Sequence, residues 1–378
     1  IIQNFKRKEH TMAGSNFGKF FQISTWGESH GKALGVVIDG CPAGILLSEE
    51  DIQKDLDKRK PGQSPFSTSR IEPDQVEILS GVFQGKTTGT PISLIIYNTN
   101  QRSSDYTEIS KCYRPGHADY TYDKKYGFRD YRGGGRSSGR ETITRVAAGA
   151  IAKKILQELN VKITTYTLSI GPITIDKSNF NEDEIFTNFL GMPDTVAAKK
   201  ATHFLMKQKM KQDSTGGIIE CIVHGLPAGV GEPVFEKLDA MLAKALFSIG
   251  AVKGVEFGAG FSATTLSGSQ NNDCFRYTQE GKIEKLTNFA GGITGGISDG
   301  FPIECRVAFK PTPSIGIPQP TITNQGENIN LQINGRHDPI IVPRAIIVVE
   351  SMVALTLVDY LFQSLLSKMD TIKKIFLS

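Results

Sequence analysis

Residues 132–146 read RGGGRSSGRETITRV and place arginines, glycines and two adjacent serines directly before a helical pattern. Glycine has no Cβ, so its backbone N–H groups can approach an anion closely. Arginine presents a fixed fork of donors that matches phosphate and carboxylate groups. The first turn of a helix adds unpaired N–H groups and the positive end of the helix dipole. The stretch therefore predicts an anion-binding loop at the start of a helix.

The helix that follows this loop is expected over residues 139–159. Ser138 and Glu141 have the spacing of a capping box, which predicts where the helix begins. Apolar residues recur at helical spacing and predict a core-facing side, made of Ile143, Val146, Ala147, Ala150, Ile151 and Leu159. A solvated loop and an RNA-binding arginine-glycine tract are the alternatives. Such tracts are usually longer, repetitive and disordered, whereas this one runs directly into the predicted helix.

Composition favours a small acidic ligand over a polyanionic partner. The chain has 378 residues, 39% of them hydrophobic, and a formal net charge of +4. This content suffices for a large core, and the nearly balanced charge calls for neither nucleic acid nor a membrane. Positive charge is instead local, with seven arginines between residues 102 and 145.

The cysteines and the apolar segments indicate a cytoplasmic protein. The five cysteines are scattered and none forms a CxxC pair, so neither a disulfide framework nor a metal site is predicted. Residues 1–11 are charged and lack the apolar segment of a signal peptide, so we expect an N-terminal extension before a single domain over residues 12–378. The apolar stretch near residues 340–358 contains Arg344 and Glu350, which favours a buried helix over a membrane span.

The chain is expected to adopt an α/β fold. Strands are predicted at 17–26, 34–39, 90–98, 217–224 and 301–309, and further helices at 49–60, 232–247 and 340–367. Ser48 and Asp51 form a second predicted capping box, and Pro61-Gly62 is expected to end that helix. Residues 160–215 contain no identifiable site.

A faint internal repeat divides this fold into halves. VVIDGCPAGI (36–45) is similar to CIVHGLPAGV (221–230), and GTPISLII (89–96) is similar to GFPIECRV (300–307). Arg136 before the first long helix also has a counterpart in Arg336 before the last. Glycine and proline recur at turns, so a chance match is the alternative. The shared order favours two related halves, with strand-to-helix turns from both converging on a cleft.

Two histidines lie in turns. One follows a serine in Gly27-Glu28-Ser29-His30-Gly31, and the other is in Arg114-Pro115-Gly116-His117-Ala118-Asp119. Histidine suits proton transfer near neutral pH, so two histidines with many arginines predict an enzyme that protonates an oxyanion leaving group. A nucleophilic Ser29–His30 pair is disfavoured because adjacent residues rarely form the required hydrogen bond. The alternative is that each histidine is a structural turn residue.

Two later loops add further polar groups. Lys310-Pro311-Thr312-Pro313-Ser314 offers a cation and two hydroxyls, and Gly335-Arg336-His337-Asp338-Pro339 offers a cation and a carboxylate. Asp-Pro is commonly only a turn, but this one precedes an apolar helix, as the first loop does. These residues predict an enzyme that acts on an anionic substrate with histidine acid–base groups, and they leave the reaction open.

Longer blocks of sequence occur in a characteristic order. They are WGESHGKALGVVIDGCPAG, RPGHADYTYDKKYGFRDYRGGGRSSGRETITRVAAGA, GAVKGVEFG, AGGITGGIS, KPTPSI and GRHDP. Together they resemble the chorismate synthase family from about residue 16 to residue 359. The resemblance implies a β-α-β sandwich of two pseudo-related halves in one compact unit, and a homotetramer.

The same resemblance implies a carbon–oxygen lyase of the shikimate pathway of aromatic amino-acid biosynthesis. Such an enzyme converts 5-enolpyruvylshikimate 3-phosphate to chorismate and phosphate by an anti-1,4-elimination. It requires reduced FMN without net redox change. Because no reductase domain is visible in the sequence, an external reductant is expected, such as an NADPH-dependent flavin reductase.

Matching positions carry family roles onto this chain. His30 resembles the histidine that protonates the reduced flavin, and His117 the one that faces the substrate phosphate. Asp338, relayed through Ser29, resembles the group that accepts the substrate proton by way of flavin N5. The implied substrate-binding residues are Arg59, Arg114, Arg140 and Arg336. The implied flavin-binding residues are Arg136, Ser137, Ser138, Gly250, Ala251, Gly295, Lys310, Pro311, Thr312, Pro313, Ser314 and Arg336.

Three positions depart from the family pattern. Pro65 replaces a usual arginine, Gly250 a usual asparagine, and Phe289 a usual asparagine or histidine. Pro65 removes a cation and is expected to weaken substrate binding, whereas the other two changes are tolerable where backbone atoms make the contact. The alternative function is a relative that binds flavin or phosphate ligands without catalysis. The intact histidines and Asp338 argue against it.

Overall fold

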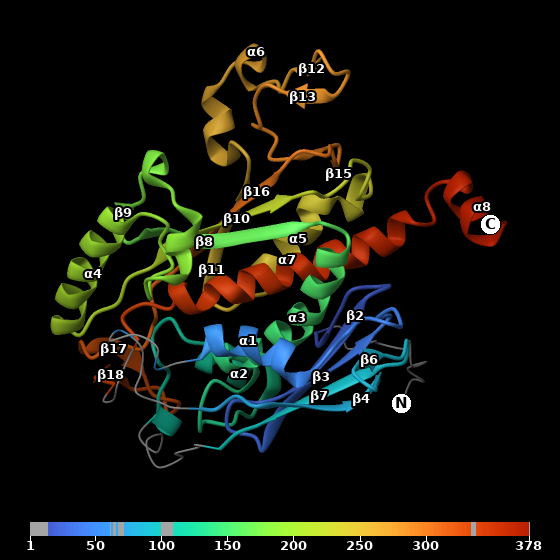
Figure 1. Cartoon of the computed structure of the whole chain (residues 1–378). Helices are drawn as coiled ribbons and strands as arrows, with labels where there is room; N and C mark the ends of the chain where they lie inside the picture. The colour runs from blue at the N-terminus through green and yellow to red at the C-terminus, as the bar shows by residue number, and fades with distance from the viewer. Residues whose placement is uncertain are drawn as a thin grey trace, which may run out of the picture.

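Two antiparallel sheets enclose a layer of helices (Figure 1). The computed structural model describes residues 14–60, 62, 66, 72–99, 109–333 and 338–377. The first sheet has the strand order β1 (Asn16–Phe17), β2 (Gln22–Gly27), β3 (Ala33–Asp39), β7 (Ile92–Tyr97) and β4 (Val76–Ser80). The second has the order β11 (Val252–Phe257), β16 (Ile303–Phe309), β10 (Gly217–His224), β8 (Lys162–Ile170) and β9 (Ile173–Thr174).

The helical layer consists of α1 (Glu49–Arg59), α3 (Thr142–Glu158), α5 (Leu238–Phe247) and α7 (Val342–Ser364). Helices α3 and α7 pack against each other between the sheets (Figure 1). Helix α7 is long and apolar enough to cross a membrane, but 89% of its most apolar 18-residue stretch is buried inside the protein. A helix that is apolar on all sides is stable inside a protein core, and this matches the sequence prediction of a buried helix.

The remaining elements lie at the periphery of the sandwich. The helices there are α2 (Asp119–Tyr126), α4 (Thr195–Met210), α6 (Gly268–Asn271) and α8 (Met369–Phe376). The short hairpins pair β5 (Val82–Phe83) with β6 (Lys86–Thr87), β12 (Phe275–Tyr277) with β13 (Ile283–Lys285), β14 (Ile293–Thr294) with β15 (Ile297–Ser298), and β17 (Gln319–Ile322) with β18 (Asn328–Leu331).

Most predicted elements are present, with shifted ends. The Ser48–Asp51 capping box of α1 is confirmed, since Ser48 Oγ accepts from Asp51 N (3.3 Å) and Asp51 Oδ2 from Ser48 N (3.0 Å). The predicted box at residues 138–141 is wrong. Ser138 caps only a short 3₁₀ turn, and Glu141 pairs with Arg145 one helical turn later (3.0 Å).

The sequence had predicted none of strands β4, β8 and β11 or helices α2 and α4, and it placed one side chain wrongly. Strand β8 and helix α4 lie within residues 160–215, for which no element had been predicted. Leu159 is half exposed at the end of α3, whereas the other predicted core residues of that helix are buried. The predicted helix at 232–247 begins only at Leu238, because residues 234–236 form a 3₁₀ turn.

The internal repeat is confirmed by strand pairing. In the aligned repeat, Val36 corresponds to Cys221 and Leu94 to Cys305. The structure pairs Val36 with Leu94 across β3 and β7, and Cys221 with Cys305 across β10 and β16. The neighbouring strands are also arranged alike, since the order β2-β3-β7-β4 in one sheet matches β8-β10-β16-β11 in the other.

The Pro-Ala-Gly turns of the two halves are closed by the same hydrogen bonds. In the first half, Thr87 Oγ1 donates to Pro42 O (2.6 Å) and Thr87 O accepts from Gly44 N (2.8 Å). In the second half, Ser298 Oγ donates to Pro227 O (2.7 Å) and Ser298 O accepts from Gly229 N (2.9 Å). Chance similarity of turn residues would not reproduce these contacts.

The close contact between α3 of the first half and α7 of the second leads to a prediction about stability. A Cβ on Gly149 of α3 would lie 2.3 Å from Ser351 Cβ of α7. We expect Gly149→Ala to lower the free energy of unfolding by about 1–2 kcal/mol, because overpacking costs about 1–3 kcal/mol and alanine recovers up to about 1 through helix propensity. Urea denaturation at fixed protein concentration measures this. Gly139→Ala is the control, because nothing lies within 4 Å of that Cβ. Equal stability of the two variants would contradict the close helix contact.

Candidate active site

His117 is positioned by a tight turn in front of α2. His117 N donates to Arg114 O (3.2 Å), and Gly116 between them has φ +69°, which glycine adopts without strain. The turn brings the imidazole back onto the first residue of the helix. There His117 Nδ1 lies 2.9 Å from Asp119 Oδ1.

Asp119 is a buried carboxylate held by two arginines. Arg114 forms a two-point contact with it, through Nε to Oδ2 (2.8 Å) and Nη2 to Oδ1 (2.7 Å), and Arg129 Nη1 lies 3.0 Å from Oδ1. Burial raises the pKa of Asp119, but hydrogen bonds from Arg114 and His117 outweigh it and hold the pKa well below the usual range. Asp119 is therefore an anion near neutral pH. Arg114 was predicted to bind substrate, but its Nε and Nη2 both donate to this carboxylate.

The glycine-rich loop packs directly on His30. A Cβ on Gly133 would lie 2.3 Å from His30 Nδ1 and 3.0 Å from Ser29 Oγ, so only glycine fits there. Ser29 Oγ and His30 Nδ1 lie 3.0 Å apart in a hydrogen bond. The expectation that these adjacent residues would not bond is therefore wrong, because the turn at Gly27–Gly31 folds the two side chains together.

Three residues predicted to bind flavin also hold the loop in shape. Arg136 Nη2 donates to Thr25 Oγ1 (2.7 Å), which ties the loop to β2. Ser137 Oγ donates to Gly134 O (2.6 Å), and Ser138 Oγ accepts from Arg140 N (3.3 Å). These contacts hold the loop in shape. They also mean that Arg136, Ser137 and Ser138 already use some of their hydrogen-bonding groups within the protein.

One cavity of about 440 Å³ is lined by both the glycine-rich loop and the His117 turn. Its lining combines the glycine-rich loop, acid–base groups and aromatic rings, and includes Glu28, His117, Tyr122, Tyr126, Phe128, Arg129, Arg136 and Ser137. The sequence had predicted that turns from both halves converge on a cleft. The described lining of this cavity comes from the first half alone, where His117 and residues 133–137 meet, so that expectation stays a prediction for this cavity.

Behind this loop, a buried cluster holds further arginines. Asp74 is fully buried and joins two of them, with Oδ2 2.6 Å from Arg59 Nη2 and Oδ1 2.9 Å from Arg140 Nη1. Arg140 Nε also donates to Asn98 Oδ1 (2.5 Å). The predicted substrate-binding residues Arg59 and Arg140 thus share one carboxylate. Sequence reasoning missed Asp74, which is separated from both arginines by at least 15 positions.

The cluster retains capacity for an anion. Arg59 Nε and Arg140 Nη2 are buried and have no hydrogen-bond partner among the described residues, although Arg140 Nη2 lies 3.6 Å from the buried carboxylate of Glu72. Burial and the nearby charge of Arg344 lower the pKa of Arg59 to about 10, against the opposing effect of Asp74. A lowered pKa means that the folded protein disfavours this cation, so its charge costs stability at neutral pH. An anionic ligand would offset that cost.

Residues from the second half reach the same region. Lys310 Nζ donates to Gly116 O (2.6 Å) beside the His117 turn, and Lys310 N donates to Ala251 O (2.9 Å). Thr312 Oγ1 donates to Asp338 O (2.7 Å). The predicted loop at 310–314 and the segment at 250–251 therefore lie together with Asp338 and with the His117 turn.

Other predicted residues are not brought to this point. Gly295 lies in the β14–β15 hairpin, at the opposite end of β16 from Lys310 and thus roughly 20 Å away. Ser29 is bonded to His30 and Asp338 to Arg344 (Nη1 to Oδ2, 2.9 Å), so the Ser29–Asp338 relay stays a prediction. Pro65, Arg336 and residues 1–11 lie outside the described residues.

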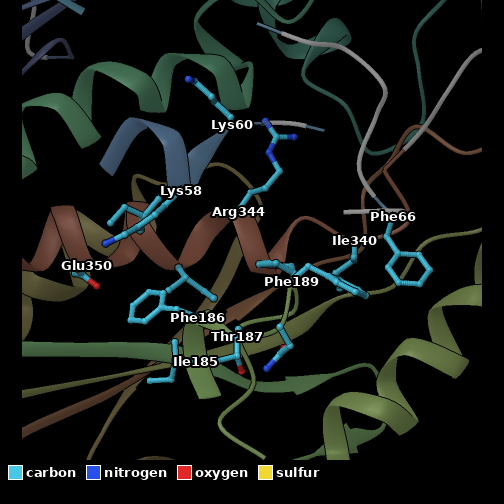
Figure 2. Close-up of a pocket in the computed structure, with 15 residues that line it drawn as sticks. Lys58, Lys60, Phe66, Ile185, Phe186, Thr187, Phe189, Ile340, Arg344 and Glu350 are labelled. Carbon is cyan, nitrogen blue, oxygen red and sulfur yellow. The ribbon is translucent and has the colours of Figure 1, made fainter. Parts of the chain in front are cut away.

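A second cavity, of about 570 Å³, lies beside Arg344 (Figure 2). Its walls come from the end of α1, the start of α7 and residues 185–191, and they are mostly apolar, with Phe189 beside Ile340 and Phe186 beside Lys58. Residues 160–215, which the sequence had left without a site, thus contribute to a cavity. Neither the glycine-rich loop nor the histidines line it.

Comparisons with known proteins agree on one family. The sequence profile of the chorismate synthase family matches residues 21–362. A chorismate synthase of Lachnoclostridium phytofermentans is 62% identical over 365 residues, which cover 97% of this chain and 100% of that protein. One from Methanosarcina mazei is 54% identical over 358 residues, with coverages of 93% and 97%. A crystal structure of chorismate synthase superposes with a TM-score of 0.74 at 33% identity, covering 95% of this chain and 97% of that one.

Proposed function

This chain belongs to the chorismate synthase family, and from that premise we propose how its site converts 5-enolpyruvylshikimate 3-phosphate to chorismate and phosphate, as a carbon–oxygen lyase. One observation supports the proposal most. The glycine-rich loop and the His117 turn share one cavity, and a buried arginine pair with unspent donors lies behind the same loop. A substrate with one phosphate and two carboxylates needs several fixed cations.

The residues of the cavity fit a reduced flavin. Tyr122, Tyr126 and Phe128 provide aromatic surface for a ring system, and the N–H groups of residues 133–135 suit a phosphate, with Lys310 nearby on the Gly116 carbonyl of the His117 turn. We propose that Ala251, Lys310 and Thr312 hold the flavin together with this loop. Reduced FMN, when bound, supplies an electron-rich partner for the substrate and is still reduced at the end of the reaction. Because Gly295 lies roughly 20 Å from Lys310, we propose that its contact with flavin is made to a site on another subunit.

The chain's own residues supply the acid–base steps. We propose that His117 gives a proton to the phosphate as it leaves, because it sits in a turn beside arginines that neutralise the leaving charge. His30, held by Gly133 and Ser29, would keep a proton at the flavin. Asp338 would accept the proton that the substrate loses, with Arg344 orienting its carboxylate (2.9 Å). Each transfer needs a group positioned within hydrogen-bond reach of its target.

Turnover under strict anaerobiosis tests the reaction. We expect one portion of dithionite-reduced FMN to support many turnovers, so that released phosphate far exceeds flavin, because substrate and product differ by no electrons. Oxidised FMN alone is expected to give no phosphate. Phosphate release that stops at one equivalent per flavin, or that consumes NADPH stoichiometrically, would instead indicate a true oxidoreductase.

The setting of the enzyme is also a proposal. An external reductase is expected to supply reduced flavin in the cytoplasm. A homotetramer is supported by exposed aromatic side chains on the projecting arm around β12 and β13, such as Phe261, Phe275 and Tyr277 (Figure 1). Light scattering would measure the mass.

A further inference from the structure

We infer that Asp119 is a positioning residue, which holds His117 Nδ1 as a hydrogen-bond donor and leaves Nε2 as the nitrogen that exchanges the catalytic proton. The inference rests on the proposed role of His117 as the acid for the leaving phosphate. It gives a role to Asp119, the last residue of the Arg114–Asp119 motif, to which the carried-over family roles assign none. Asp119 itself touches neither substrate nor flavin in this scheme.

The hydrogen-bond partners around His117 indicate which nitrogen of its neutral imidazole carries the proton. Nδ1 has two polar neighbours, Asp119 Oδ1 at 2.9 Å and Arg114 Nη2 at 3.1 Å. Arginine only donates and an ionised carboxylate only accepts. If Nδ1 carried no proton, its lone pair would face the carboxylate oxygen at 2.9 Å, which is repulsive. Arg114 Nη2 already donates to the same carboxylate oxygen at 2.7 Å, so its best acceptor is not the imidazole. A proton on Nδ1 satisfies all three groups.

The charges around the imidazole determine what else Asp119 does. Arg114 and Arg129 both contact the carboxylate, and Lys310 Nζ lies on the Gly116 carbonyl beside the turn. Further charges line the cavity, carried by Glu28, Asp130 and Arg136. Because two guanidinium groups already share the carboxylate, its charge is largely compensated. We therefore expect its main effect on the orientation and tautomer of His117, with a smaller effect on proton affinity.

The same carboxylate ties together both ends of the local segment. Asp119 is the first residue of α2, Arg114 precedes the turn, and Arg129 follows the helix. Arg129 also donates to Cys112 O (3.0 Å) and lies 3.4 Å from Asp123. The imidazole is therefore fixed relative to a rigid helix end, as a proton donor has to be for a reaction that requires a narrow geometry.

The test compares Asp119→Asn with Asp123→Asn. Both substitutions remove one negative charge from α2 next to Arg129, but only the first contacts His117. Asparagine can turn an amide N–H toward Nδ1 and so favours a proton on Nε2. In ¹⁵N NMR of the flavin-free protein at a pH where His117 is neutral, we expect wild type and Asp123→Asn to show protonated Nδ1, and Asp119→Asn to lose that signature.

The kinetic effect provides a second readout. We expect Asp119→Asn to lower kcat by about 10²–10⁴-fold with KM for substrate changed less than about threefold, since the proton donor is mispositioned while the anion contacts remain. Asp119→Glu, which keeps the charge for both arginines, is expected to restore the Nδ1–H signal and part of kcat.

The outcomes separate the two proposals. An unchanged His117 tautomer in Asp119→Asn overturns the positioning role, whatever the activity. Equal loss of kcat in Asp123→Asn would also overturn it, since a general effect of charge or helix stability would then suffice. The NMR result needs no turnover, so it stands even if the elimination itself fails its phosphate test.

Discussion

His117→Ala is expected to lower kcat by about 10²–10⁴-fold, the usual cost of losing a positioned acid or base. The imidazole lines the cavity and shares the Asp119 carboxylate with Arg129, and Asp119 is held as an anion that cannot replace it as an acid. Anaerobic phosphate release with reduced FMN measures the effect. Because His117 is part of a turn and does not lie in the core, its removal should leave the circular dichroism spectrum and the thermal midpoint nearly unchanged.

His203→Ala is the matched control. His203 is exposed on α4 and belongs to none of the site segments, so its loss is expected to leave kcat within about twofold of wild type. A His117→Ala protein that keeps its rate but loses stability would identify His117 as a structural turn residue. The same comparison applies to His30→Ala, where the partner lost is the Ser29 hydroxyl (3.0 Å).

The sequence predicted what depends on local spacing. The glycines of the loop were expected to let backbone N–H groups approach an anion, and the structure adds another requirement at Gly133, because any Cβ there would collide with His30. The repeat predicted equivalent halves, and the paired registers of β3–β7 and β10–β16 confirm it. Such features are visible in a sequence because turns and strand patterns place similar residues at fixed offsets.

The partners of the cations were not predictable in the same way. Asp74 binds Arg59 and Arg140 across 15 and 66 positions of sequence, and no local pattern marks that pairing. The capping box at Ser138 failed for a related reason, since Glu141 has a competing partner in Arg145. Sequence reasoning found the arginines, whereas the carboxylates that orient them emerge only from the packing of α1, α3 and the segment before β4.

The two halves contribute different chemistry to the one region. The first half supplies the histidine turns, the glycine-rich loop and the buried arginine pair. The second half supplies the loop at 310–314 and Asp338, which meet the His117 turn through Lys310 and Gly116. Neither half alone holds both the proposed proton acceptor and the proposed proton donor. This explains why a sandwich with a pseudo-twofold repeat can carry a single asymmetric site.

Asp74→Asn is expected to destabilise the protein by about 3–5 kcal/mol, the usual cost of removing one partner from a buried ion pair. The amide keeps the shape of the carboxylate, and asparagine tolerates the positive φ of +47° at this residue. What is lost is the charge that compensates two buried guanidinium groups, on Arg59 and Arg140. Urea denaturation at fixed protein concentration measures the loss of stability.

Two comparisons make that result specific. Asp57→Asn removes a carboxylate that pairs with Lys60 at the surface of α1, and surface pairs contribute only about 0–1 kcal/mol, so its stability should be close to wild type. Adding the substrate should raise the thermal midpoint of wild type more than that of Asp74→Asn, because Asp74 fixes the direction of the donors on Arg59 and Arg140. If Asp74→Asn matched Asp57→Asn in stability and retained the full substrate-induced shift, the arginine pair would not depend on Asp74. Arg59 Nε and Arg140 Nη2 could then not be regarded as a preformed anion site.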